Sequence, residues 1–536
     1  MNNKLVALAL LAALAAAAVA ASSCGDRPEA WSQPASVEVT FGLTRAVAVV
    51  DAPADRVVLL VPGTGQSLRI DAVPVGRNIL TVVASPKREK LFVLSAGHRA
   101  KIGDDEADEK PSLTVIEPGV PAQRYVLASL TDPLAGLAID PIEERWAIMY
   151  AATGPNQAFV QNPNELVFLD VSQPPETATL RAHTLHSFGG RPARLTFTPT
   201  LGLPGGDRRL LIVESDQDLS ILDLADPDNE ISVPLTSGND NRRLAPAAVV
   251  VDDGDPARVD DARIGVRLQN DPSVITLTLE PEPGTIGFRP TVNLTDVGGI
   301  PTDIAFVRTD GGLRLAALVP PRSEAVLVDP VTSLTTHVAL PARYASLSLV
   351  TDSAGGGAGA PVDVALLWNG GAATDGVAFW ELGQTAGRPY RSIETIGVVS
   401  AIAAVLPVPQ HPALRVLQTA SAKEFYVLDL QTRTAAPLVT STAAIALSMS
   451  PVGDQVWTFA PSGTNVAATG ILDTHPRSLI IERPVRHVFE VANDDGRFAM
   501  IVHGGGNGGV TIYDADTLDD DTRRLYSSVL TGGPYQ

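Results

Sequence analysis

At residues 445–459 the chain reads Ile445-Ala446-Leu447-Ser448-Met449-Ser450-Pro451-Val452-Gly453-Asp454-Gln455-Val456-Trp457-Thr458-Phe459. Two short apolar runs flank the segment Ser450–Gly453, whose residue types are those of a tight turn. Runs of this length, bounded by turn residues, predict two antiparallel strands rather than a helix. Residues 79–94 repeat the arrangement around Ser85-Pro86. The chain therefore contains more than one copy of a β-hairpin unit.

A further apolar strand, ending near an aspartate, follows each pair and is the easiest part of the unit to track. It recurs at Leu68–Ile70, Leu113–Glu117, Leu166–Val171, Leu219–Leu224, Val274–Leu279, Ala325–Asp329, Val377–Leu382, Phe425–Leu430, Ala467–Asp473 and Val510–Asp514. Successive copies lie roughly 42 to 54 residues apart, which is the span of a four-stranded propeller blade with its loops. Helical periodicity is nearly absent. We predict an all-β chain, a β-propeller of about ten four-stranded blades.

The closure of the ring admits two solutions, one large propeller or two smaller ones. The first unit, from Arg45 to Val75, has room for about three strands. Val37–Phe41 is a spare strand that completes this blade or pairs with the last one. The units follow one another without a linker, and the glycine-rich stretch Ser353–Pro361 lies inside a unit. These features favour one large ring, although propellers usually have four to eight blades.

The turns at Ser85-Pro86 and Ser450–Gly453, with the strands Leu91–Leu94 and Val456–Phe459 that follow them, resemble YVTN-type propeller repeats. In those repeats a Ser-Pro-Asp-Gly turn joins the two inner strands of a blade. The resemblance is clear in about two units, so it implies the propeller fold and identifies no substrate.

The first residues have the pattern of a bacterial export signal. Lys4 precedes the apolar run Leu5–Ala20, which is short for a membrane-spanning helix. Ala21-Ser22-Ser23-Cys24 then resembles the lipobox of bacterial lipoproteins, with Ala21 where that family usually has Leu. Cleavage after Ala20 is the alternative. We predict a lipoprotein signal at 1–23, a lipid on Cys24, a tether at 24–35 and the propeller at 36–536.

Composition restricts the partners. The chain has 536 residues, 45% of them hydrophobic, a net charge of −20 and one cysteine. The single cysteine excludes an internal disulfide. The negative charge disfavours nucleic acid and anionic lipid surfaces. We expect a monomer whose only link to the membrane is its lipid.

Short motifs with catalytic or metal-binding associations have structural explanations. His503-Gly504-Gly505-Gly506 copies the oxyanion-loop string of some esterases, but the Gly-x-Ser-x-Gly that those enzymes need is missing. Gly504–Gly509 also fits a dinucleotide-binding pattern, but a strand follows it instead of a helix. His183 and His186 are three apart, so on a strand they face opposite sides. The acidic clusters Asp104–Glu106, Asp252–Asp255 and Asp519–Asp521 lack the spacing of a calcium loop. We predict no catalytic residues, metal or cofactor.

Arginine recurs just before the strands expected to line the channel. The five positions are Arg45, Arg77, Arg194, Arg343 and Arg486. A ring of guanidinium groups at one channel mouth forms an anion-binding site for carboxylate or phosphate. The alternative is that each arginine pairs with a loop carboxylate.

These observations predict a lipid-anchored binding or scaffold module of the cell envelope, facing the periplasm or the cell surface, with a protein or glycan partner. Gly25 after Cys24 favours the outer membrane. The alternative is a lactonase-like or other hydrolase that uses the central channel, which the YVTN-type resemblance allows. Only Asp303, His487 and Glu490 interrupt the apolar inner strands as candidate groups for such an enzyme.

Overall fold

The structure is a single closed ring of β-sheets. The computed structural model describes residues 37–530, apart from residues 38, 100–107, 129–133, 152–161, 187–189, 204, 237–242, 255–257, 260, 283–286, 351–362, 371–375, 386–387, 391, 399, 421–423, 439, 441–445, 474 and 506–507. The signal, Cys24 and the tether lie outside these residues. In the described part, regular structure consists of strands and three short 3₁₀ turns, η1 (Ala52–Ala54), η2 (Thr64–Gln66) and η3 (Pro320–Arg322).

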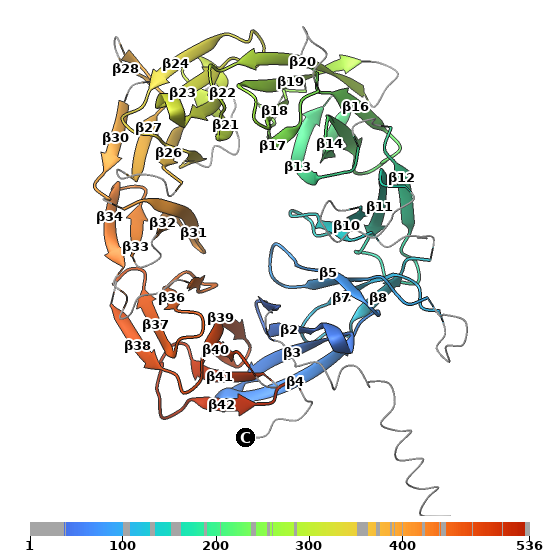
Figure 1. Ribbon diagram of the computed structural model, residues 1–536, viewed down its shortest axis with the longest axis vertical. Helices are drawn as coiled ribbons and strands as arrows, with labels where there is room; N and C mark the ends of the chain where they lie inside the picture. The colour runs from blue at the N-terminus through green and yellow to red at the C-terminus, as the bar shows by residue number, and fades with distance from the viewer. Residues whose placement is uncertain are drawn as a thin grey trace, which may run out of the picture.

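Ten antiparallel sheets of four strands are arranged as the blades of one propeller, here numbered 1 to 10 along the chain (Figure 1). The innermost strands are β1 (Thr40–Gly42), β5 (Ile79–Ala84), β9 (Gly136–Ile139), β13 (Arg194–Leu203), β17 (Pro246–Asp252), β21 (Asp303–Thr309), β25 (Ser346–Leu349), β31 (Ile402–Val408), β35 (Ala446–Met449) and β39 (Val485–Asn493). The second strands are β2 (Val47–Asp51), β6 (Leu91–Ser95), β10 (Trp146–Tyr150), β14 (Gly206–Glu214), β18 (Arg263–Leu268), β22 (Gly312–Val319), β26 (Val364–Trp368), β32 (His411–Thr419), β36 (Gln455–Phe459) and β40 (Gly496–His503).

The outer half of each blade continues the same order. The third strands are β3 (Arg56–Gly63), β7 (Ser112–Ile116), β11 (Glu165–Asp170), β15 (Asp218–Asp223), β19 (Ser273–Glu282), β23 (Glu324–Val328), β27 (Val377–Glu381), β33 (Phe425–Asp429), β37 (Asn465–Gly470) and β41 (Gly509–Asp514). The outermost strands are β4 (Ser67–Pro74), β8 (Gln123–Val126), β12 (Leu180–Thr184), β16 (Glu230–Pro234), β20 (Gly287–Asp296), β24 (Thr335–Ala339), β30 (Ser392–Ile396), β34 (Thr434–Leu438), β38 (Pro476–Ile480) and β42 (Arg524–Ser527). Blade 7 carries a separate small hairpin, β28 (Gln384–Thr385) with β29 (Arg388–Pro389).

The prediction of about ten blades in one large ring is confirmed, and so are nine of the ten tracked strands, which are the third strands of blades 2 to 10. The first one, Leu68–Ile70, is wrong because it belongs to the fourth strand, β4. The spare strand is the reason. Thr40–Gly42 pairs with β2 as the innermost strand of blade 1, so every later strand of that blade moves outward by one place.

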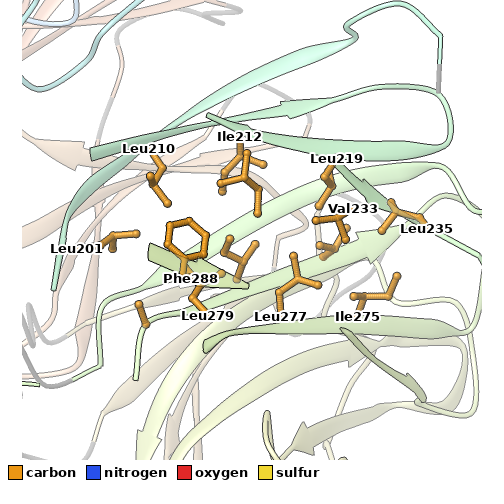
Figure 2. Packing of buried hydrophobic residues seen from close by; sticks show 14 of the residues in the cluster. Leu201, Leu210, Ile212, Leu219, Val233, Leu235, Ile275, Leu277, Leu279 and Phe288 are labelled. Carbon is orange, nitrogen blue, oxygen red and sulfur yellow. The ribbon is translucent and has the colours of Figure 1, made fainter. Parts of the chain in front are cut away.

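Ten buried apolar clusters hold the ring together, one at each junction between neighbouring blades. Figure 2 shows the cluster between blades 4 and 5, where Leu210 and Leu219 face Leu277, Leu279 and Phe288. Apolar side chains leave water on both faces of each sheet, which is the main stabilising term. This packing explains why the inner strands have continuous apolar runs.

Aspartates lie at the ends of third strands, or up to three residues beyond them, for a local reason. Each of their carboxylates accepts a backbone N–H two residues further on, which stabilises the turn into the outermost strand. The aspartates are Asp170, Asp223, Asp329, Asp429, Asp473 and Asp514. The aspartate seen in the repeat is therefore a turn residue.

Blades 1 and 10 close the ring without exchanging a strand. Blade 1 is built only from N-terminal strands and blade 10 only from C-terminal strands. Their junction is a shared apolar cluster that includes Val47 and Val491. Polar contacts add to it: the Asn493 amide donates to the Pro62 carbonyl at 2.6 Å, and the Tyr526 hydroxyl donates to the Gln66 carbonyl at 3.1 Å.

Candidate functional site

A cavity of about 990 Å³ lies in the wall of the central channel. The innermost strands β1, β31, β35 and β39 line it together with the end of β5, so it spans five successive blades and crosses the junction between blades 10 and 1. It reaches the end of the channel at which the innermost strands turn into the second strands, called here the turn mouth. Ligand sites commonly have this size and a mostly apolar wall.

Aromatic and flexible apolar side chains form most of the cavity wall. Phe41 comes from β1 and Phe489 from β39, and Leu447 and Met449 come from β35. All four are only partly buried, so part of each side chain is left available. The imidazole of His487 stacks on the ring of Phe489 with centroids 5.7 Å apart and an angle of 25° between planes. Aromatic faces and a thioether suit a flat apolar ligand.

The turn between β5 and β6 brings two cations to the edge of this wall. Lys87 and Arg88 both line the cavity and are exposed. In the described part of the chain, neither side chain forms an ion pair. Backbone bonds fix the turn, since Thr44 N–H donates to the Arg88 carbonyl at 2.8 Å and Lys87 N–H donates to the Glu144 carboxylate at 3.0 Å.

Glu490, the one acid in the cavity lining, is held in a hydrogen-bond network behind the wall. Its side chain is fully buried beside Arg497, with Nη2 to Oε1 at 2.6 Å. Trp457 Nε1 donates to its other oxygen at 2.9 Å, and the Ser450 hydroxyl donates to Oε1 at 3.0 Å. Burial would lower the pKa of Arg497, but its bonds to Asp454 and Glu490 raise that pKa above the ordinary value. The Glu490 charge is therefore neutralised locally.

Of the other two polar groups predicted on inner strands, His487 lines the cavity together with Glu490, and Asp303 lies elsewhere in the ring. Asp303 lies at the start of β21 in blade 6, and its carboxylate accepts the N–H groups of Leu347 at 2.9 Å and Ile304 at 3.0 Å. Burial raises the pKa of Asp303, and these bonds partly oppose the rise. Asp303 thus links blade 6 to blade 7. His487 stacks on Phe489 in the cavity wall, whereas the Glu490 side chain is buried behind it.

The structure places four of the five predicted arginines at the mouth opposite the turn mouth. Arg77 precedes β5, Arg194 begins β13, Arg343 precedes β25 and Arg486 is the second residue of β39. Arg45 is the exception: the strand after it is the second strand of blade 1, so Arg45 lies in the β1–β2 turn at the turn mouth. The expectation that all five precede innermost strands is therefore wrong for Arg45.

Among the described residues, carboxylate partners can be named for Arg45, Arg77 and Arg194. Arg45 Nη2 lies 2.9 Å from Asp494, Arg77 Nε 3.4 Å from Glu109, and Arg194 Nη1 3.6 Å from Glu214. Burial raises the pKa of Glu214, and the Arg194 charge opposes this rise. These pairs agree with the alternative interpretation of the arginines, and anion binding by the set stays a prediction.

His183 and His186 are closer together than strand geometry predicts. β12 ends at Thr184, so His186 leaves the strand and its ring centroid lies 5.6 Å from that of His183. Both contact Glu230: His183 Nε2 lies 2.8 Å from the carboxylate, and His186 donates its backbone N–H to it. Within the described ranges, no group of three or more side chains has the arrangement of a metal site.

The histidine of the oxyanion-like string has a structural role. His503 ends β40, is buried, and its Nε2 lies 2.7 Å from the Thr511 hydroxyl. Burial lowers the pKa of His503 to about 4. Gly506 and Asn507 of the following loop lie outside the described residues.

The structure shows the contacts of one predicted acidic cluster and does not describe another. In the second cluster, Asp252 accepts the Gly254 N–H at 2.7 Å and lies 3.4 Å from Arg308, while Asp253 accepts the Gly202 N–H of blade 4 at 2.7 Å. Burial raises the pKa of Asp252 and of Asp253. Both therefore hold loops between blades. Asp104–Glu106 lies outside the described residues.

The cavity itself was missed by reasoning from sequence. Its wall joins Phe41 to Phe489, and no local pattern connects residues so far apart. The proline turns at Pro86 and Pro451, which carried the repeat resemblance, do line it and were the available signal.

Comparisons with known proteins show no family. No family model matches the chain, and no curated protein matches it. Solved structures do match, among them dihydro-heme d1 dehydrogenase NirN in complex with DHE. That match has 12% sequence identity and a TM-score of 0.37, and it covers 92% of this chain and 77% of that one. In the residues that the structure describes, no helix is long and apolar enough to cross a membrane.

Proposed function

We propose that this ten-bladed propeller is a bacterial envelope lipoprotein that binds a ligand in its channel cavity. The observation that carries the proposal is the cavity of about 990 Å³ in the channel wall, because its wall combines partly exposed aromatic side chains with exposed cations. A rigid ring of sheets keeps such a wall preorganised, which lowers the cost of binding.

Binding is favoured over hydrolysis by the state of the inner-strand acids. A general base or a metal ligand needs a carboxylate that can reach the substrate. Both oxygens of Glu490 already accept hydrogen bonds from side chains of blade 9, and Asp303 accepts two backbone N–H groups, one of its own blade and one of blade 7. The similarity to YVTN-type repeats is part of the same proposal and concerns the turn and the strands that build a blade.

The cellular location of the protein is proposed from the sequence. Small residues before Cys24 support a lipid on its thiol, with the apolar run 5–20 as the export signal. Several acyl chains would hold the protein stably, since each buried methylene contributes about 0.8 kcal/mol. Outer-membrane placement, a monomeric state and contact with an envelope protein or glycan through the outer faces complete the proposal.

Metabolic labelling tests the anchor. The full-length chain, produced in a bacterial host fed with alkyne-tagged palmitate, should take up the label and partition with membranes. Cys24→Ser should lose the label and become soluble, whereas the matched Ser23→Ala variant should keep both properties. Label on the Cys24→Ser protein would reject the lipoprotein assignment.

Metal analysis of the purified protein separates binding from the hydrolase alternative. We expect divalent metal well below one ion per chain after dialysis without chelator. A tightly held ion at one per chain would favour the lactonase-like alternative, because enzymes of that kind use a channel metal.

A further inference from the structure

The charged groups of the channel cavity have the opposite sign to the protein as a whole. The chain carries a net charge of −20, yet Lys87 and Arg88 are the charged side chains exposed in the cavity lining. Glu490 is fully buried, and its charge is neutralised by Arg497. A local positive site in an acidic protein attracts an anion and repels a cation.

The rest of the wall selects an apolar body. Phe41, Phe489, Leu447 and Met449 come from three blades and converge on one cavity. We propose, building on the proposed binding function, that the cavity holds a small amphipathic organic anion. Its flat apolar part lies against the two phenylalanines, and its carboxylate or sulfonate faces Lys87 and Arg88, which supply charge-assisted hydrogen bonds.

The cationic edge is held in place before any ligand arrives. Ala492 N–H donates to the Thr44 carbonyl at 2.8 Å, and Thr44 N–H donates in turn to the Arg88 carbonyl at 2.8 Å. This backbone chain joins blades 10, 1 and 2 beside the cavity. The Arg88 backbone therefore loses little conformational entropy when a ligand binds, which favours the bound state.

The ligand also bridges the two ends of the chain. Phe41 belongs to blade 1 and Phe489 to blade 10, so a molecule between them contacts both sides of the junction that closes the ring. A ligand that binds only the closed ring stabilises it by mass action. Binding should therefore raise the unfolding temperature.

Two fluorescent probes with almost the same aromatic body test the proposal. 8-Anilino-1-naphthalenesulfonate carries a sulfonate, and N-phenyl-1-naphthylamine carries no charge. Calorimetric titration of the purified protein should give one site for the sulfonate probe, at least about tenfold tighter than for the neutral probe, because two charge-assisted contacts are lost without the sulfonate.

Variants locate the site. Lys87→Gln with Arg88→Gln should weaken the sulfonate probe about tenfold and the neutral probe less than about twofold. Lys110→Gln with Arg524→Gln removes the same charge at exposed positions outside the cavity lining and should change neither. Met449→Trp fills the cavity and should weaken both probes. Circular dichroism and unfolding temperature confirm that each variant is folded.

The outcomes separate this inference from the broader proposal. Equal affinity for both probes, lost together in Met449→Trp, would overturn the anion preference and leave the cavity as a binding site. Binding that Met449→Trp leaves unchanged, or no binding of either probe, would overturn the cavity assignment. Palmitate labelling reports on the anchor independently of all these results.

Discussion

The Cα of Gly42, in the first innermost strand, lies directly against the ring of Phe489, in the last one, so closely that a Cβ at residue 42 would overlap the ring. These residues belong to blades 1 and 10, which share no strand. The ring therefore closes by side-chain packing and a few hydrogen bonds, and the quality of this contact determines how firmly it is closed.

Gly42→Ala should destabilise the protein by about 1–3 kcal/mol, the usual cost of overpacking, because the Phe489 ring must move. Gly397→Ala is the matched control, since a Cβ there meets no atom within 4 Å; it should stay within about 0.5 kcal/mol of the wild type. Urea unfolding measures both. Equal stability of the two variants would show that the junction between blades 1 and 10 accommodates the added Cβ without loss of unfolding free energy.

A buried ion pair joins blades 3 and 4. Arg209 contacts Asp140 with two hydrogen bonds of 2.5 and 2.8 Å, and Asp140 is fully buried. Burial would raise the pKa of Asp140, but its bond to Arg209 and backbone N–H groups lower that pKa. Arg209→Ala leaves the buried Asp140 carboxylate without its cationic partner and should lower the free energy of unfolding by about 3–5 kcal/mol.

The exposed pair Arg69–Asp71 is the control for Arg209. Arg69→Ala should cost less than about 1 kcal/mol, because water screens this pair. Thermal and urea unfolding provide the comparison. If Arg209→Ala lowered the free energy of unfolding no more than Arg69→Ala, the buried pair would not contribute to stability.

His503 predicts a pH dependence of stability. Its pKa is about 4 in the folded protein, and an unfolded histidine has a pKa of about 6.5. The unfolded chain therefore binds the proton first as pH falls below 6.5. Stability is lost progressively down to pH 4, and by linkage the loss between pH 7 and pH 5 is about 2 kcal/mol.

His503→Gln removes this titration and can still bond Thr511. The difference in unfolding free energy between pH 7 and pH 5 should shrink by about 2 kcal/mol relative to the wild type. His475→Gln, at an exposed position, should leave the difference unchanged. A wild-type pH dependence in the His503 variant would mean that the imidazole is protonated in the folded ring.

The repeat was predictable from sequence because each blade carries its own signals. Apolar runs, proline turns and the third-strand aspartates are all local, so the strands of blades 2 to 10 could be tracked. Blade 1 was misassigned because Thr40–Gly42 is only three residues long and ends in glycine. The position of Arg45 followed from the same error.

The cavity could not be predicted because it depends on closure. Phe41 and Phe489 become neighbours only when the two ends of the chain meet, and no short-range pattern encodes that meeting. The pairs Arg77 with Glu109 and Arg194 with Glu214 were missed for a different reason, because each forms within one blade between residues that are distant in sequence. The sequence indicated that these arginines stand at the starts of innermost strands. Their carboxylate partners lie on other strands or loops, so the sequence did not indicate the pairing.

Glu490 and Trp457 provide the last prediction, which concerns the support behind the cavity wall. Trp457 is fully buried in blade 9 and donates to the Glu490 carboxylate of blade 10 at 2.9 Å. Glu490→Ala would leave the buried indole N–H and Gln455 without this acceptor and Arg497 without one of its carboxylates, so we expect a loss of about 3–5 kcal/mol.

Arg483→Ala, which changes an exposed charge near blade 10, is the control and should cost less than about 1 kcal/mol. Trp457 also gives a local readout, because loss of its hydrogen bond should alter the tryptophan emission of the folded Glu490 variant. An unchanged emission together with wild-type stability would mean that the network does not hold blades 9 and 10 together, and that the cavity wall is supported by apolar packing alone.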